Sequence, residues 1–279
     1  MAFNPIIDFI LKQEQFGYEL NNKKVITLPY ADDFCLITTN MRVQQRLISE
    51  IDNHIQGMGM RLKPVKCRSF SIQQGKPSVI HFKISEAIIP SIHEEEQKFL
   101  GKVIFFTGKS TDVYTYFKDV IETKLKNIDE TTIRNEYKMW IYQNYFLPSI
   151  RFLLTVHDIT FTDIQKIDSL SHRYLKKWAG IPRCGTNLIF HMRDGLNIPT
   201  IFSLYEEAHS LNHTAMRIKG DETVNLALDS CVSRESKLQR KKSITVRAEG
   251  VFRKALNQNC IGGELPSFPD ETWNKEKPS

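Results

Sequence analysis

The stretch VITLPYADDFCLI, Val25–Ile37, decides how the first part of this chain folds. Two short apolar runs, Val25–Leu28 and Phe34–Ile37, flank a polar tip. Runs of β-branched and aromatic residues on either side of turn residues are typical of a β-hairpin. We therefore expect two antiparallel strands that carry two adjacent aspartates, Asp32 and Asp33, at their turn.

The adjacent aspartates allow two interpretations. Aspartate is a common turn residue, so the pair could serve only to make the turn. Two neighbouring carboxylates repel each other, however, and apolar strands would hold them in a fixed arrangement. Mg²⁺ prefers oxygen ligands, typically one or two carboxylates completed by substrate phosphates and water. A rigid Asp32–Asp33 pair therefore also suits a two-metal phosphoryl-transfer centre.

The composition is that of an ordinary globular protein. The chain has 279 residues, 41% of them hydrophobic, which is enough for one large domain or two smaller ones.

The five cysteines form no CxxC pair, which argues against a disulfide scaffold or a cysteine zinc site. His209 and His213 lie four apart without a glutamate after His209, which favours a helix-surface pair over zinc binding. With no signal peptide or membrane span visible, we expect an intracellular chain, nuclear or cytoplasmic.

Apolar residues at helical spacing indicate two helices in the first part of the chain. One covers residues 3–16, and the other carries a Val43–Ile55 stripe that Gly57 should end. Residues 60–106 contain short apolar runs punctuated by proline and glycine, which indicates extended structure. This part of the sequence therefore predicts a small sheet with helices.

From about Thr111 onward the pattern predicts helices. An aromatic-rich helix over Ile133–Phe146 should end at Pro148, because proline cannot continue the hydrogen-bond ladder. Further helices should begin after Thr160, a plausible N-cap, and near Thr200. Taken with the sheet, this pattern predicts an α+β fold.

Positive charge is concentrated late in the chain. The segment Arg234–Lys254 carries a net charge of +6, which equals that of the whole chain. Such a run suits a polyanionic partner, and a solvated basic linker is the alternative. We expect residues 226–279 to form a basic, largely disordered tail. Its nucleic-acid-binding candidates are Arg240, Lys241 and Lys242.

Four motifs in order resemble the reverse transcriptases of non-LTR retrotransposons. The tip YADD resembles their catalytic motif C, and FNPIIDFIL resembles the helix after motif B. GMGMRLKPVKC resembles motif D, and KFLGKVI resembles motif E, the primer grip. The helical part, with WAGIPRCGTNLIFH and GLNIPTIFSLYEEAHS, is similar to the thumb and the region beyond it. The likeness covers roughly residues 3–225. It implies part of a palm over residues 1–108, followed by an α-helical thumb and connection region over 109–225.

The resemblance implies Mg²⁺-dependent RNA-directed DNA synthesis, with an RNA template, a DNA primer and dNTP as partners and no membrane. Asp32 would be the catalytic metal ligand and Asp33 its adjacent carboxylate, which makes both metal-binding candidates. Tyr30 would lie under the primer terminus. Lys66 matches the motif D lysine, which would donate a proton to the leaving pyrophosphate. A solvated surface lysine is the alternative for Lys66.

The resemblance also assigns the primer grip to Phe99, Leu100 and Gly101. Glycine at the last position would permit close backbone approach to the primer. The alternative for these residues is a simple turn between strands.

The resemblance implies further parts that this sequence does not contain. The family uses a third carboxylate from motif A, a Gly-rich motif B turn and fingers, and nothing before Asp8 matches them. We therefore expect the chain alone to be inactive, and the DNA just upstream to encode these motifs. A catalytically dead remnant that at most binds nucleic acid is the alternative function.

Overall fold

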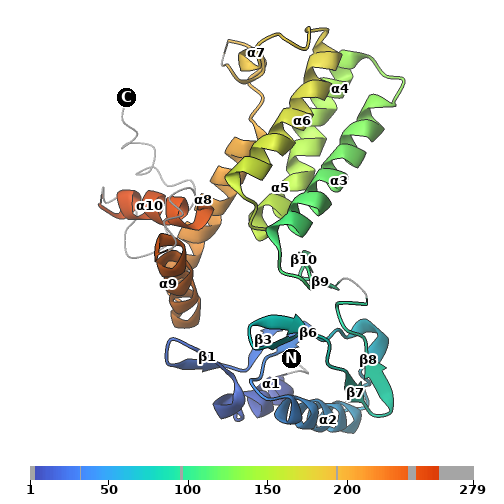
Figure 1. Cartoon of the computed structure of the whole chain (residues 1–279), viewed down its shortest axis with the longest axis vertical. Helices are drawn as coiled ribbons and strands as arrows, with labels where there is room; N and C mark the ends of the chain where they lie inside the picture. The colour runs from blue at the N-terminus through green and yellow to red at the C-terminus, as the bar shows by residue number, and fades with distance from the viewer. Residues whose placement is uncertain (1–3, 32, 95–96, 193, 238–242, 258–279) are drawn as a thin grey trace. The chain divides into compact units, whose positions relative to one another are not determined.

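The structure is a computed structural model that describes residues 4–31, 33–94, 97–192, 194–237 and 243–257. The chain divides into two compact units, Met1–Gly108 and Lys109–Ser279 (Figure 1). Within the described residues, the first unit contains five two-stranded antiparallel sheets with helices, and the second is built from helices. The predicted α+β fold class is confirmed.

The first unit is built from short helices and strands. In chain order they are α1 (Asn4–Leu11), η1 (Glu14–Phe16), β1 (Tyr18–Leu20), β2 (Lys23–Val25), β3 (Thr27–Tyr30), β4 (Asp33–Leu36), α2 (Met41–Gly57), η2 (Pro64–Lys66), β5 (Ser71–Gln73), β6 (Lys76–Ser78), β7 (Phe82–Ile84), β8 (Ala87–Ile89), β9 (Gln97–Phe99) and β10 (Lys102–Ile104). Each sheet is a hairpin of two consecutive strands, so its contacts are local in sequence.

Helix α2 supplies much of the apolar core of the first unit. Its N-cap is Asn40, whose side chain accepts a hydrogen bond from the Arg42 amide at 2.8 Å. The Val43–Ile55 stripe faces inward as its spacing predicts, and the core contains fully or nearly fully buried residues of α1, α2 and the chain before β3: Ile6, Ile10, Ile26, Leu47, Ile51 and Ile55. The side chains of Phe34 and Leu36 pack against this core and fix one face of the β3–β4 hairpin.

The second unit consists, where described, of helices and one π-helical turn. They are α3 (Ser110–Asp129), α4 (Asn135–Ile141), the π turn η3 (Tyr142–Phe146), α5 (Leu147–Val156), α6 (Phe161–Ala179), α7 (Leu188–His191), α8 (Ile201–Lys219), α9 (Glu222–Lys237) and α10 (Ile244–Asn257). Helices α3 to α6 lie alongside one another as a bundle around a large apolar core (Figure 1). None of the helices described in either unit is both long and apolar enough to cross a membrane.

Pro148 does not end the aromatic-rich helix, so this expectation was wrong. The chain continues from α4 through the π turn η3 into α5, and Pro148 occupies the first turn of α5. Proline is tolerated where its missing amide would have no helical partner. The wider π turn supplies that position, because its hydrogen bonds run from residue i to i+5 rather than i+4.

The late basic segment also differs from its expectation. We predicted a largely disordered tail over 226–279, but α9 and α10 form within its described part. Ile244, Ala248 and Ala255 of α10 are buried. Their four- and seven-residue spacing places them on one helical face, so packing against α8 and α9 stabilises α10. Polar composition concealed this amphipathic helix.

Candidate active site

The YADD stretch forms a tight hairpin. Strands β3 and β4 pair antiparallel with Tyr30 opposite Asp33, which leaves a two-residue turn. Ala31, the first turn residue, has φ 54°. Two-residue hairpin turns favour positive φ because their twist matches that of the strands. A side-chain-bearing residue in this region is strained by about 1 kcal/mol or more. Asp32, the predicted catalytic ligand, lies outside the described residues.

The outer face of this hairpin is exposed. Strand alternation puts Leu28 and Tyr30 on the face opposite the core. Tyr30 is 63% exposed and Leu28 48% exposed, while Asp33 is also exposed. The register therefore brings the Tyr30 and Asp33 side chains together at the turn end of the ladder, accessible from solvent. The Asp33 carboxylate is an oxygen donor of the kind that Mg²⁺ prefers.

The described residues do not by themselves assemble a metal centre. Within that part of the chain, no three His, Cys, Asp or Glu side chains gather closely enough to hold an ion. The role of Asp33 as a metal ligand stays a prediction, as does that of Asp32.

Lys66 ends the short helix η2 and is exposed. Its amide donates to the Lys63 carbonyl at 2.9 Å, so the backbone around it is defined. The role of Lys66 as a proton donor stays a prediction.

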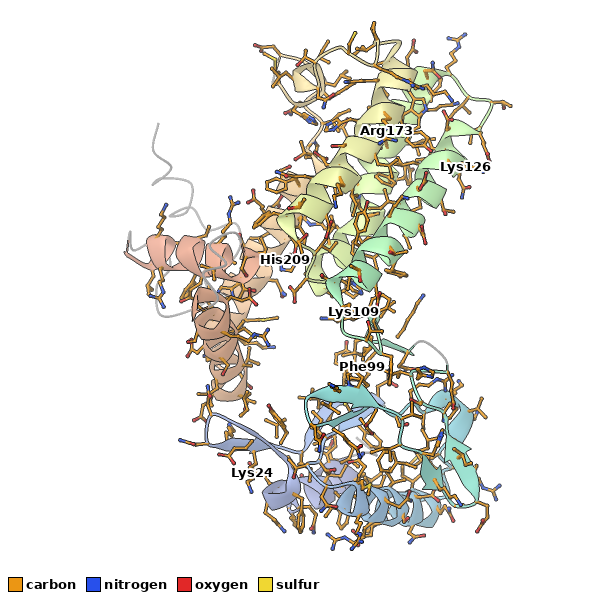
Figure 2. The ribbon with its side chains drawn as sticks, in the orientation of Figure 1. Lys24, Phe99, Lys109, Lys126, Arg173 and His209 are labelled. Carbon is orange, nitrogen blue, oxygen red and sulfur yellow. The ribbon has the colours of Figure 1, made fainter. Side chains whose placement is uncertain are left out.

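The predicted primer grip forms a second two-residue hairpin turn. Phe99 of β9 pairs with Lys102 of β10, and Figure 2 shows the Phe99 side chain at this hairpin. Leu100 and Gly101 between them have φ 49° and 80°. Both residues are thus in the left-handed region that such hairpins favour. The turn is present in the structure, and its contact with a primer stays a prediction.

Sequence reasoning missed a buried ionic cluster centred on Glu249 of α10. Its carboxylate accepts hydrogen bonds from His213 at 2.7 Å, from Arg217 at 3.0 Å and from Arg253 at 2.7 Å. These donors hold the pKa of Glu249 at about 2, even though burial acts to raise it. The expectation of a helix-surface histidine pair was wrong for His213, which is buried because α10 covers this part of α8.

A second polar cluster ties the connection before α8 to α6. His172 and His191 approach Nε2 to Nε2 at 2.7 Å, and His191 Nδ1 lies 2.6 Å from the Ile198 carbonyl. Asp168 accepts a hydrogen bond from the Ile201 amide at 2.8 Å and so caps α8. Burial lowers the pKa of His172 and raises that of Asp168. No local sequence pattern indicated this cluster, because its partners are up to 33 residues apart.

Arg240, Lys241 and Lys242, the predicted nucleic-acid-binding residues of the tail, lie outside the described residues. Among the described basic residues of the same segment, Arg253 pairs with Glu249 and Arg247 pairs with Glu206. Part of the segment's charge is therefore neutralised by neighbouring carboxylates.

Comparison with known proteins shows which proteins this chain is similar to. No family model matches this chain. It is 23% identical to the retrovirus-related Pol polyprotein from type-1 retrotransposable element R2 of Nasonia vitripennis, over 74% of this chain and 21% of that protein. It is 22% identical to the Pol polyprotein from type-2 retrotransposable element R2DM of Drosophila melanogaster, over 72% of this chain and 20% of that protein. A type-1 R2 Pol polyprotein of Popillia japonica is 25% identical over 63% of this chain and 30% of its own length.

These matches confirm the resemblance to non-LTR retrotransposon reverse transcriptases, and the chain is related to that class of protein. The particular relatives are Pol polyproteins of R2 elements. The chain spans about a fifth to a third of the length of these curated relatives, as the shares of 20% to 30% indicate.

Proposed function

We propose that this chain is the motif C to motif E part of the palm, followed by the thumb, of a non-LTR reverse transcriptase. The observation that carries the proposal is the YADD hairpin, which exposes Tyr30 and Asp33 at one tight turn in a chain related to R2 Pol polyproteins. Residues 1–108 would supply the palm part, and the helices over 109–225 the thumb and the region beyond it.

In this role the hairpin turn is the reaction centre. Asp32 and Asp33 would bind Mg²⁺, which supplies charge neutralisation for the attack of a primer 3′-hydroxyl on a dNTP α-phosphate. Tyr30 would hold the primer terminus, and Lys66 would give a proton to the departing pyrophosphate. The Leu100–Gly101 turn would approach the primer backbone.

Two carboxylates on one turn cannot readily clamp two metal ions, so the complete centre needs a third carboxylate from a motif A strand. The present 279 residues contain no match to that motif. The second candidate function follows from this observation: the chain on its own binds nucleic acid without catalysing synthesis.

Primer extension tests whether the chain by itself can catalyse synthesis. The purified chain is incubated with a DNA primer on an RNA template, dNTPs and Mg²⁺, and the expected result is no extension. Template-dependent incorporation that Asp32→Ala abolishes would show that the chain is a complete catalyst and overturn its proposed incompleteness.

Photo-crosslinking tests the palm assignment itself. A primer with a photoreactive 3′-terminal nucleotide is annealed to an RNA template, and crosslinked peptides are mapped. We expect crosslinks at Thr27–Leu36 and Gln97–Ile104, reduced by Tyr30→Ala. Tyr18→Ala is the matched control, because Tyr18 is a similarly exposed tyrosine (57%) outside both hairpins. Crosslinks that fall only in the second unit would contradict the assignment.

A further inference from the structure

Four aromatic side chains on the α4–η3–α5 segment are exposed. Tyr137 is 58% exposed, Trp140 54%, Tyr145 62% and Phe152 53%. Among the described residues of the second unit, these are the phenylalanine, tyrosine and tryptophan side chains with such exposure. Burying rings of this size is a large contribution to stability, so leaving them in water has a cost that needs a reason. We call these four residues the aromatic stripe.

The π turn brings two rings of the stripe into contact. In a regular α-helix, neighbours on one face are three or four residues apart. Trp140 and Tyr145 are five apart, yet their rings meet edge to face with centroids 5.4 Å apart. Tyr145 lies within η3, and the i to i+5 geometry of this π turn accounts for the contact. At about 1.5 Å rise per residue, the stripe from Tyr137 to Phe152 is roughly 20 Å long.

The surroundings of the stripe are polar and slightly basic. Over residues 131–157, three basic side chains stand against one acidic side chain, a net charge of +2 with histidine neutral. Two of these basic side chains already have partners within the protein. Lys138 is buried and donates to the Asp129 carbonyl, and Arg151 pairs with Glu207 at 2.8 Å. From α3, the Lys124 ammonium lies 3.2 Å from the Ser149 hydroxyl. The segment thus complements a polyanion weakly, and its rings offer the main contact.

We propose that the aromatic stripe binds single-stranded nucleic acid by stacking unpaired bases on Tyr137, Trp140 and Tyr145, with Phe152 extending the surface. Flat rings recognise the π face of any base. The Lys124 ammonium beside Ser149 of α5 is a cation within reach of a phosphate on this segment. Bases of a duplex are already stacked on one another and are not available to side chains. The proposal rests on the proposed function only in taking nucleic acid as the partner, and it adds a site in the second unit, on residues other than those of the motif C and motif E hairpins.

The test measures affinity by fluorescence anisotropy of a labelled, unstructured RNA of about 12 nucleotides, within the usual range of single-strand site sizes. Trp140→Ala and Tyr145→Ala should each weaken binding by about tenfold, the loss typical of one stacked base. Trp140→Phe should retain most of the affinity because it keeps a ring. Tyr18→Ala, which removes an exposed tyrosine from the first unit, should change nothing.

Intrinsic fluorescence provides an independent readout. Trp178 is buried, so in a Trp273→Phe background the accessible indole is Trp140. We expect single-stranded RNA to quench this emission and a blunt duplex of the same length to leave it largely unchanged. Far-ultraviolet circular dichroism checks that each variant keeps its helices.

Three results would overturn the proposal. One is unchanged RNA affinity in both alanine variants, and another is equal quenching by duplex and single strand. The third is loss of self-association in Trp140→Ala, seen by sedimentation, with no change in RNA affinity, which would make the stripe a protein interface. None of these results depends on the primer crosslinks at the hairpins, so failure of this proposal and failure of the palm assignment are distinguishable.

Discussion

At the scale of single residues, the buried hydroxyl of Tyr205 should contribute to the stability of the fold. This hydroxyl donates to the Ile159 carbonyl and accepts from the Ile159 amide, each at 2.9 Å. Burial raises its pKa, so it remains protonated. Tyr205→Phe leaves both backbone groups unpaired in the core, and the free energy of unfolding should fall by about 1–3 kcal/mol.

Urea denaturation measures this loss. Tyr137→Phe removes the same hydroxyl from an exposed ring and should stay within about 0.5 kcal/mol of the parent chain. Equal effects of the two changes would mean that the Tyr205 hydrogen bonds contribute nothing specific.

Glu249 gives the second prediction at this scale. Glu249→Gln leaves Arg217 and Arg253 without their buried anion, so the free energy of unfolding should fall by about 2–3 kcal/mol. Asp229→Asn is the control: this carboxylate also pairs with Arg217, but its side chain is 59% exposed and its loss should cost less than about 1 kcal/mol. Thermal or urea unfolding at neutral pH distinguishes the two.

The same residue sets a pH dependence. The folded pKa of Glu249 is about 2, below its ordinary value of 4.5. A lowered pKa stabilises the folded state above the ordinary value, and this contribution disappears as pH falls through the folded value. The stability difference between the parent chain and Glu249→Gln should therefore shrink between about pH 4.5 and pH 2. A difference that stays constant over this interval would contradict the ionic origin.

The residues of the two hairpin turns, together with His213, show how much of a site the sequence can predict. The adjacent aspartates and their apolar flanks sufficed to predict the hairpin that carries Tyr30 and Asp33. The positive φ values of Ala31 and Leu100 could not be predicted, because neither is glycine or asparagine and the ladder around each turn imposes them. The burial of His213 was equally inaccessible, since it depends on a helix that begins 31 residues later.

At the scale of elements, the helix start at Thr160 was predicted and leads to a prediction. The Thr160 hydroxyl accepts a hydrogen bond from the Asp163 amide at 3.2 Å and caps α6. Thr160→Ala should lower the free energy of unfolding by about 1 kcal/mol. Thr155→Ala, whose hydroxyl donates within a helix to the Arg151 carbonyl, should change stability by less than about 0.5 kcal/mol. A reversal of this order, measured by urea denaturation, would argue against the cap.

Elements defined by local signals were predicted well, and those defined by packing were not. The Val43–Ile55 stripe follows directly from helical spacing. Gly180, with φ 67°, ends α6 because glycine adopts this backbone conformation without strain. The π turn before Pro148 and helix α10 do not. Tyr142 of the π turn contacts Trp178 of α6, and α10 packs against α8, so each involves contacts with an element distant in sequence. The aromatic stripe depends on that π turn and was therefore invisible as a stripe.

At the scale of the whole molecule, the segment Arg234–Lys254 carries a net charge of +6, equal to that of the whole chain. Arg247 and Arg253 within the basic segment are matched by Glu206 and Glu249, so they contribute little to a polyanion's attraction. Arg240, Lys241 and Lys242 form the densest basic run of the sequence, and their charge is the largest local excess. Salt dependence can separate binding through these charges from binding through the aromatic stripe.

Replacing Arg240, Lys241 and Lys242 together by alanine should weaken sequence-independent RNA binding. Each phosphate contact releases counterions, so the slope of log affinity against log salt should become shallower by about two to three. Lys12, Lys76 and Lys83 are exposed lysines of the first unit outside the two hairpins assigned to the primer, and their joint replacement removes equal charge as the control. If the control flattens the slope equally, only net charge matters, and if neither does, the run is a solvated linker. Trp140→Ala should lower the affinity at every salt concentration and leave the slope unchanged, because stacking releases no counterions.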